Sequence, residues 1–221
     1  MALYANKEIH IRDFHEKDFD EAAALVADIW MPEPEEIKLN AGRVDLATYA
    51  KRATFLKVAE CNNHILGLIA AKAGEAAHSH QKHWQNIADK ALLSISECNE
   101  KHAQKLADYY HFLHSRYADM YREINLDTTY ELVLFAVSSH AQGYGVGSKL
   151  LAGATNYLRS CGAQSYYLLT DTTCNWQFYE NRQMTRCGEY KASEDEIRAH
   201  GVHELYIYSS TLEKDFSESS H

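Results

Sequence analysis

Residues 131–157 read ELVLFAVSSHAQGYGVGSKLLAGATNY and combine a strand, a glycine-bearing turn and the start of a helix. The run 131–137 is apolar, contains β-branched residues and has the length of a buried strand. The helix repeats apolar residues at helical spacing, and Gly162 is placed to end it in a left-handed conformation. Its apolar positions are Leu150, Leu151, Ala154, Tyr157 and Leu158.

The turn at residues 142–147, QGYGVG, contains three alternate glycines that let backbone amides approach a ligand closely. The start of a helix carries unpaired N–H groups and the positive end of the helix dipole, so the turn favours binding of phosphate. Such turns also serve only to change chain direction. The spacing matches neither a P-loop nor G-x-G-x-x-G, which disfavours a nucleotide triphosphatase and a Rossmann dehydrogenase.

The spacing resembles the Q/R-x-x-G-x-G/A pyrophosphate loop of the GNAT superfamily, the acyl-CoA-dependent N-acyltransferases, with Gln142, Gly145 and Gly147 at the motif positions. The resemblance continues through residues 165–184, SYYLLTDTTCNWQFYENRQM, which look like the next family strand, an Asn and a helix with an F-Y-E core. The two segments cover a little under half of the chain. The alternative is an α/β domain with a glycine turn and no acyl-CoA site.

The resemblance implies an α/β (α+β) fold with a GNAT-like mixed, mostly antiparallel central sheet of about seven strands flanked by helices. A tight hairpin is expected at Asn62 and Asn63, because asparagine tolerates positive φ. A single domain is predicted over residues 1–213, followed by a flexible tail at residues 214–221. The predicted strands are residues 8–13, 55–60, 65–73, 131–137, 166–171, 186–191 and 204–210.

The first helix is predicted to begin at a capping box of Asp18 and Glu21 and to end at Pro32 and Pro34. Residues 31–43 are expected to form an acidic loop, which is either simply solvated or attracts a cationic acceptor. A short helix is predicted over residues 45–53, and another over residues 175–182. The buried face of the first helix would comprise Ala22, Leu25, Val26 and Ile29, and the loop carboxylates are Glu33, Glu35 and Glu36.

Residues 75–125 contain neither glycine nor proline and carry two helical apolar stripes, which one continuous helix could carry. Two antiparallel helices, a helical hairpin inserted between the third and fourth strands, are favoured because one helix of this length would be unusual on a compact domain. The break is expected at residues 96–99, with Asn99 capping the second helix. This insertion could wall the acceptor pocket, pack on its own domain, or bury its stripes in a homodimer.

The composition excludes several classes of protein. A net charge of -9 and the absence of a basic run argue against a nucleic-acid partner and suit a cationic substrate. No apolar run has the length of a signal peptide core or a membrane span, so we expect no membrane partner and a cytoplasmic location. His111 and His114 could ligate a metal, but they lack a Cys or carboxylate partner at a known spacing, and no metal is expected.

The resemblance implies acetyl-CoA as co-substrate, with its pyrophosphate on the turn amides and its pantetheine paired along the fourth strand. Asn175 would hold the cofactor or cap a helix. Substitution of Gly145 or Gly147 by Val is expected to block the cofactor before it unfolds the protein. The expected cofactor-binding residues are Val137, Ser139, Gln142, Gly143, Tyr144, Gly145, Val146, Gly147, Ser148 and Asn175.

The resemblance also implies two catalytic residues. Tyr179, in N-W-Q-F-Y-E, would protonate the departing thiolate, because a phenol is protonated at neutral pH. Glu131 matches the general base of histone-type members, and a structural ion pair is the equal alternative. In a regular strand Glu131 would share a face with Val133, Phe135 and Val137. Asp171 and His140 are weaker candidates for the base.

One position departs from the family pattern. The family usually follows F-Y-E with a glycine that ends the helix in a left-handed conformation, whereas this chain has Gln183 there. Either Gln183 is strained or the helix ends differently. The function predicted is acetyl transfer from acetyl-CoA to a primary amine of a small molecule or protein, by direct attack through a tetrahedral intermediate. The alternatives are a catalytically silent acyl-CoA-binding sensor and an unrelated nucleotide-binding domain.

Overall fold

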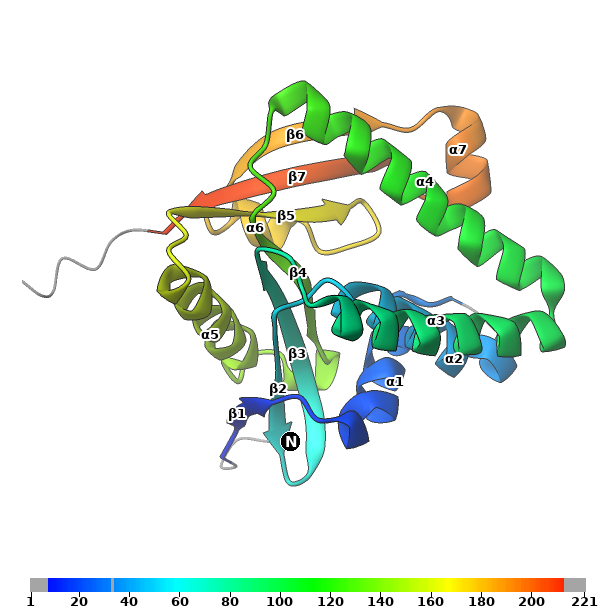
Figure 1. The fold of residues 1–221 in the computed structure, drawn as a ribbon, viewed down its shortest axis with the longest axis horizontal. Coiled ribbons are helices and arrows are strands. Elements are labelled where there is room, and N and C mark those ends of the chain that lie inside the picture. The colour runs from blue at the N-terminus through cyan, green and yellow to red at the C-terminus, as the bar shows by residue number, and fades with distance from the viewer. Residues whose placement is uncertain (1–7, 33, 213–221) are drawn as a thin grey trace, which may run out of the picture.

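A seven-stranded sheet forms the centre of the protein (Figure 1). The computed structural model describes residues 8–32 and 34–212. The strand order is β1-β2-β3-β4-β5-β7-β6, and only the pair β4–β5 is parallel, so the mixed, mostly antiparallel sheet is confirmed. The strands are β1 (His10–Asp13), β2 (Phe55–Cys61), β3 (His64–Ala73), β4 (Tyr130–Val137), β5 (Ser165–Asp171), β6 (Thr185–Lys191) and β7 (Glu204–Thr211).

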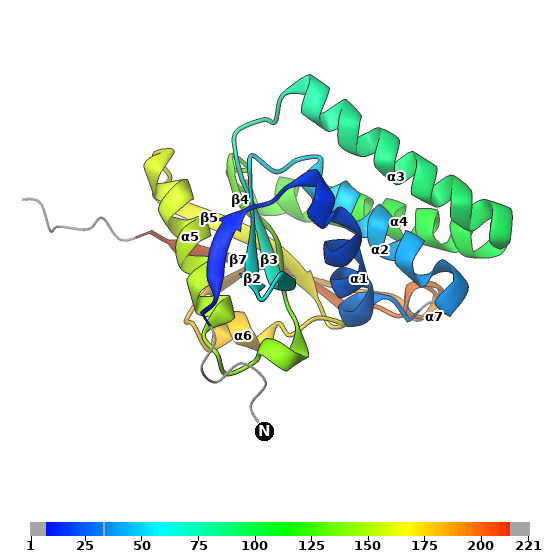
Figure 2. The ribbon, with the colours of Figure 1, turned by 90° about the horizontal axis from the view of Figure 1, so that it is seen from below.

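Helices cover both faces of this sheet (Figures 1 and 2). On one face α5 (Val146–Ser160) buries Leu150, Ala154 and Leu158 completely, as its periodicity predicts. On the other face lie α1 (Phe19–Trp30) and α2 (Glu35–Ala50), whose apolar residues pack on β2, β3 and β4. The two faces thus have separate cores, and the hairpin at Asn62 and Asn63, with φ of 52° and 62°, is confirmed.

The prediction of an acidic loop over residues 31–43 is wrong, because α2 begins at Glu35. Pro34 precedes the helix, and Glu35 and Glu36 lie in its first turn, where carboxylates interact favourably with the helix dipole. Glu33 lies outside the described residues. Gly42, which disfavours a helix by propensity, lies where α2 approaches α1 closely, because a Cβ there would lie 2.2 Å from the Ala23 carbonyl oxygen.

Two details of α1 also differ from prediction. Ile29 is 38% exposed and does not belong to the buried face. The predicted capping box of Asp18 and Glu21 is absent, since the Asp18 side chain accepts hydrogen bonds from the backbone N–H of His15 and from Arg12 instead. The bond to the guanidinium outcompetes the cap because it is charge-assisted.

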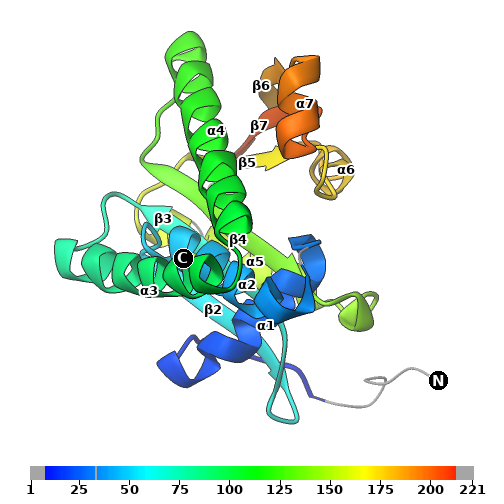
Figure 3. The same ribbon diagram turned by 90° about the vertical axis from the view of Figure 1, so that its right-hand side faces the viewer.

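The helices α3 (His78–Cys98) and α4 (Glu100–Ile124) lie between β3 and β4. They break at Asn99, whose side chain accepts a hydrogen bond from the His102 N–H, which confirms the predicted cap. They are not a tight antiparallel pair, because they diverge from the Asn99 turn (Figures 1 and 3). α3 packs on α2, whereas α4 crosses to β5 and β7 through Phe112, Tyr117 and Met120.

The charged connection after β6, which carried no predicted element, contains α7 (Glu194–His200). Ser193 and Glu196 form a capping box, and Gly201 ends the helix with φ of 73°. The helix predicted over residues 175–182 is the single turn α6 (Gln177–Glu180). Within the described part of the chain, no helix is both long and apolar enough to cross a membrane.

Two glycine-to-alanine substitutions test the helix packing. Gly42→Ala is expected to destabilise the protein by roughly 1–3 kcal/mol, because the added methyl overlaps the backbone of α1. Gly153→Ala in α5, whose Cβ would lie 3.9 Å from Phe55, should stabilise by about 0.5–1 kcal/mol through helix propensity. Urea unfolding measures the change in the free energy of unfolding for both variants. A stabilising effect of Gly42→Ala would contradict the close approach of α2 to α1 at this glycine.

Candidate active site

The site begins where β4 and β5 separate. The two strands pair only at Glu131–Tyr167 and Leu132–Leu168, so residues 133–137 of β4 have no partner strand on that side. Unpaired N–H and C=O groups on such an edge can pair with an extended ligand as an added strand would. A cleft of about 1420 Å³ opens at this gap and is lined by β4, β5, the glycine turn, α2, α4 and α6.

The glycine turn presents its amides to this cleft. Gly145 is the N-cap of α5 with φ of 74°, and the first amide to join the helix ladder is Lys149, which donates to the Gly145 carbonyl at 3.0 Å. The preceding amides of Val146, Gly147 and Ser148 therefore point out of the first turn, as at any helix start. This geometry and the dipole of α5 suit an anionic group.

The glycines of the turn have different roles. Gly143 and Gly145 have positive φ, and a Cβ at either would meet no protein atom within 4 Å, so their open side is free for a ligand. At Gly147 a Cβ would lie 3.3 Å from Phe135 Cζ. The expectation that Gly147→Val blocks the cofactor before it unfolds the protein stays a prediction, and the added side chain would also press on Phe135 in the free protein.

The remaining predicted cofactor residues do not all reach the cleft. Val137, Gln142 and Asn175 line it, and Asn175 does not cap α6 with its side chain. Ser139 is exposed in a 3-10 turn, Ser139–Ala141, and neither Ser139 nor Tyr144 belongs to the lining. The sequence could not separate these positions, because which turn residues face the cleft depends on how the turn packs against the rest of the chain.

Tyr179 lies on α6 at the edge of the same cleft. Its ring packs against Phe178 at 5.3 Å and Tyr208 at 5.8 Å, and its hydroxyl has no hydrogen-bonding partner among residues 8–32 and 34–212. Burial raises the pKa of the Tyr179 phenol well above its usual range, so the hydroxyl is protonated at neutral pH. The hydroxyl is therefore an available proton donor.

Gln183 adopts the left-handed conformation, with φ of 59°, in place of the glycine expected from the family pattern. The turn closes through a hydrogen bond of 3.2 Å from the Met184 N–H to the Tyr179 carbonyl. A non-glycine residue in this conformation costs about 1 kcal/mol or more. Of the two sequence-based alternatives, strain at Gln183 is the one observed, and the turn beside Tyr179 keeps its geometry.

Comparison with known proteins agrees with this site. Residues 99–183 match the acetyltransferase (GNAT) family, a range that contains the glycine turn and Tyr179. The resemblance to the GNAT family is confirmed. No curated protein matches the chain by sequence.

Solved GNAT structures share the fold. Ard1 from Thermoplasma volcanium superposes with a TM-score of 0.52 at 15% identity, covering 93% of this chain and 99% of its own. The ribosomal-protein-S18-alanine N-acetyltransferase from Escherichia coli gives 0.51 at 11% identity, covering 97% and 100%. A protein from Desulfovibrio desulfuricans assigned to the GNAT family gives 0.52 at 14% identity, covering 92% and 99%. Identities this low establish the common fold alone.

Glu131 does not share a face with Phe135 and Val137, contrary to the expectation for a regular strand. A bulge in β4 leaves Val133 without a partner on β3, so the side-chain alternation reverses between Leu132 and Leu134. Phe135 and Val137 pack on the α5 side of this GNAT fold, while Glu131 faces α2 and α4.

Glu131 is 1% exposed and is held by two partners. Its Oε1 lies 2.9 Å from the Arg52 guanidinium, and its Oε2 accepts a hydrogen bond of 3.0 Å from the Tyr167 hydroxyl. The structural ion pair, one of the two sequence-based alternatives, is thus present. A role as general base stays a prediction. Of the weaker candidates, Asp171 lines the cleft, whereas His140 is exposed in the 3-10 turn.

A second part of the cleft, which we call the acceptor lobe, lies on the face of the sheet opposite α5 and was not predicted from the sequence. It contains Asp45 on α2, Asp171 at the end of β5, and tyrosines of α2 and α4. Both carboxylates are buried, at 4% and 6% exposure. The feature of the sequence that could have indicated this lobe is Asp45, the single charged residue on the otherwise apolar buried face of α2. The tyrosines are Tyr49, Tyr109, Tyr110 and Tyr117.

Burial changes the protonation of this lobe. It raises the pKa of Asp45 to about 7 despite a 2.6 Å hydrogen bond from the Tyr110 hydroxyl, and the charge of Asp171 adds to the effect. Burial also raises the pKa of Cys174 to about 12, so this thiol is protonated and not a nucleophile at neutral pH.

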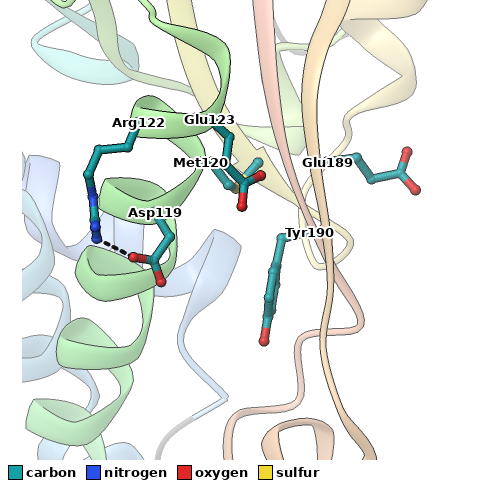
Figure 4. A pocket seen from close by; sticks show the side chains of 6 residues that line it. All are labelled: Asp119, Met120, Arg122, Glu123, Glu189 and Tyr190. Atoms are coloured by element: carbon teal, nitrogen blue, oxygen red, sulfur yellow. Dashed lines mark hydrogen bonds and ion pairs between the residues drawn. The ribbon is translucent and has the colours of Figure 1, made fainter.

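A smaller hollow of about 340 Å³ lies between α4 and β6 (Figure 4). Asp119 and Arg122 form an ion pair at its edge, and both are exposed enough for solvent to screen them. It contains no glycine turn and no buried charged group, so it does not compete with the cleft as a catalytic site. In the part of the chain that the structure describes, no group of three or more His, Cys, Asp or Glu residues could hold a metal ion.

The raised pKa of Asp45 predicts a pH-dependent stability. The folded protein binds this proton more tightly than the unfolded chain, so Asp45 lowers stability as the pH rises from about 4 to about 7. Asp45→Asn should be more stable than wild type by roughly 2–4 kcal/mol at pH 8, and the difference should vanish near pH 4.

Urea unfolding from pH 4 to pH 8 measures this difference. The matched control is Asp108→Asn, an exposed carboxylate on α4, whose stability should run parallel to wild type at every pH. A constant difference between Asp45→Asn and wild type would contradict the assignment.

Proposed function

We propose that the protein transfers an acetyl group from acetyl-CoA to an amine. The observation that carries this proposal is the meeting of three features in one cleft: the helix-start amides of α5, the unpaired edge of β4, and the protonated hydroxyl of Tyr179. The GNAT family match supports acetyl transfer, and the open side of Gly143 and Gly145 supports a bound diphosphate. The amine acceptor and the use of acetyl-CoA are part of the proposal.

The α5 amides, the free edge of β4 and Tyr179 would each have a separate role in the proposed reaction. Bound acetyl-CoA supplies an activated acetyl group as a thioester. The amides of Val146, Gly147 and Ser148 hold its diphosphate, and the free edge of β4 near Val137 pairs with its amide-containing arm. A backbone N–H on that edge stabilises the oxyanion that forms when the amine attacks.

Tyr179 completes the reaction by donating its proton to the departing sulfur as the C–S bond breaks. Its raised pKa makes the phenol a weaker acid, and the same apolar surroundings favour the neutral thiol over the thiolate, which offsets part of that effect. The proton lost by the amine passes to solvent. The alternative function is a sensor that binds acyl-CoA without turnover, because the fold alone does not determine chemistry.

Binding of the cofactor at the glycine turn is tested with a pair of strained glycines. Gly145 and Gly74 both have positive φ and open space where a Cβ would lie, but Gly74 follows the end of β3, away from the turn. Both alanine variants should lose about 1 kcal/mol of stability. Only Gly145→Ala should weaken coenzyme A binding, by about tenfold or more in calorimetry, because its methyl group faces the diphosphate. Equal coenzyme A affinities of the two variants would show that the glycine turn does not bind the cofactor.

Tyr179→Phe separates catalysis from binding. Loss of the proton donor is expected to lower kcat for acetyl transfer by about 100-fold, within the range for general acids, while coenzyme A affinity stays unchanged. Release of free thiol with a panel of amines measures the rate. Wild-type protein that binds acetyl-CoA and acetylates no amine would favour the sensor.

A further inference from the structure

Four carboxylates are buried among the described residues, and the chain neutralises only two of them. Asp18 pairs with Arg12 at 2.6 Å, and Glu131 pairs with Arg52 at 2.9 Å. Asp45 and Asp171 have no Lys, Arg or His side chain within 4.0 Å in residues 8–32 and 34–212. Burying a carboxylate without a positive partner costs free energy of folding. The presence of two such carboxylates in one cavity is therefore not explained by the stability of the fold.

The hydrogen bonds to these two carboxylates orient them without supplying charge. The Tyr110 hydroxyl donates to Asp45 Oδ1 at 2.6 Å, which fixes α4 against α2. The Thr173 N–H and hydroxyl both donate to Asp171 Oδ1, at 2.7 and 2.5 Å. All of these donors are neutral. When both carboxyl groups are ionised, the acceptor lobe is therefore an oriented anionic site, and a cationic ligand would supply its counter-charge.

Aromatic rings complete the lobe. The rings of Tyr109 and Tyr110 pack edge to face with their centroids 5.6 Å apart, and Tyr49 and Tyr117 line the same cleft. Burial raises the pKa of each of these phenols, so all four are neutral, and their π faces attract cations. Three basic groups that line the cleft are engaged elsewhere: Lys51 donates to Gln85, Lys72 pairs with Glu75, and Arg182 lies over the Phe178 ring.

We propose that the acceptor is a small aliphatic diamine whose second, non-reacting ammonium group binds between Asp45 and Asp171. The inference rests on the proposed function, because it names the substrate class of the same cleft. Carboxylates stabilise the ammonium form of a nearby amine, whereas the reacting nitrogen must be neutral. The group held by Asp45 and Asp171 is therefore not the one that is acetylated.

The reaction is balanced with the second ammonium unchanged. The neutral nitrogen forms the N–C bond and gives one proton to solvent, the C–S bond breaks, the sulfur takes a proton from Tyr179, and Tyr179 regains a proton from solvent. Asp45 and Asp171 act as specificity-determining residues, since they bind the acceptor without touching the bonds that change.

The test compares ligands that differ only in the second charge. Linear diamines of three to six carbons and the monoamines of equal length are titrated calorimetrically into the intact protein with coenzyme A, at pH 8, where Asp45 is ionised. At least one diamine should bind about tenfold or more tightly than its monoamine. The same preference should appear in kcat/KM for acetyl transfer, mainly through KM.

Substitutions of the two carboxylates test whether they cause the preference for diamines. Asp45→Asn and Asp171→Asn keep the side-chain shape and should reduce the diamine preference to near one, while the protein still binds coenzyme A. Glu36→Gln, an exposed residue on the same helix as Asp45, removes the same charge and should change nothing. Thermal unfolding of each variant confirms that it folds, and the retained coenzyme A affinity reports an intact cleft.

The outcomes are distinguishable. Equal binding of diamine and monoamine, or an unchanged preference in both Asn variants, overturns the inference. So does efficient acetylation of monoamines or peptide amino termini with no gain from a second charge, although that result supports the proposed acetyl transfer. Preferential diamine binding that Asp45→Asn abolishes, with no acetyl transfer to any amine, supports the binding site and refutes the proposed function.

Discussion

The architecture depends on the short pairing between β4 and β5. Two parallel residue pairs hold the strands together, and beyond them the strands separate, so the sheet contains an internal edge instead of a continuous ladder. An internal edge is shielded from other chains by its own domain, which avoids the aggregation risk of an exposed strand. The bulge at Val133 then turns Glu131 toward one face and Phe135 toward the other. A single gap thereby connects the two faces of the sheet.

The two sides of this gap have different chemistry. On the α5 side the groups offered to a ligand are mainly backbone N–H groups and one phenol, which suit an anionic and largely extended molecule. On the α2 and α4 side the groups are buried carboxylates and tyrosine rings. In the proposed function, this division would place the negative charge of the cofactor and the positive charge of the acceptor on opposite sides of the reacting centre.

Helix α4 determines the shape of the second side. It is attached at two points, since the Tyr110 hydroxyl donates to Asp45 on α2 and the Tyr117 hydroxyl donates to the Thr170 carbonyl at the end of β5. A helix that bridges both halves of the split sheet covers the gap and excludes solvent from the carboxylates beneath it. The inserted helices therefore build part of the site as well as packing on their own domain.

The sequence by itself determined the features encoded in neighbouring residues: the strand, turn and helix around Gly145, the hairpin at Asn62 and Asn63, and the cap at Asn99. These follow from local backbone preferences, which one chain displays. Only the tertiary structure decided that Gly42 belongs to a helix, that Glu131 faces α2, and that Asp45 and Asp171 line the same cleft. The reason is that close helix packing, a bulge and a buried charge each depend on residues far apart in the chain.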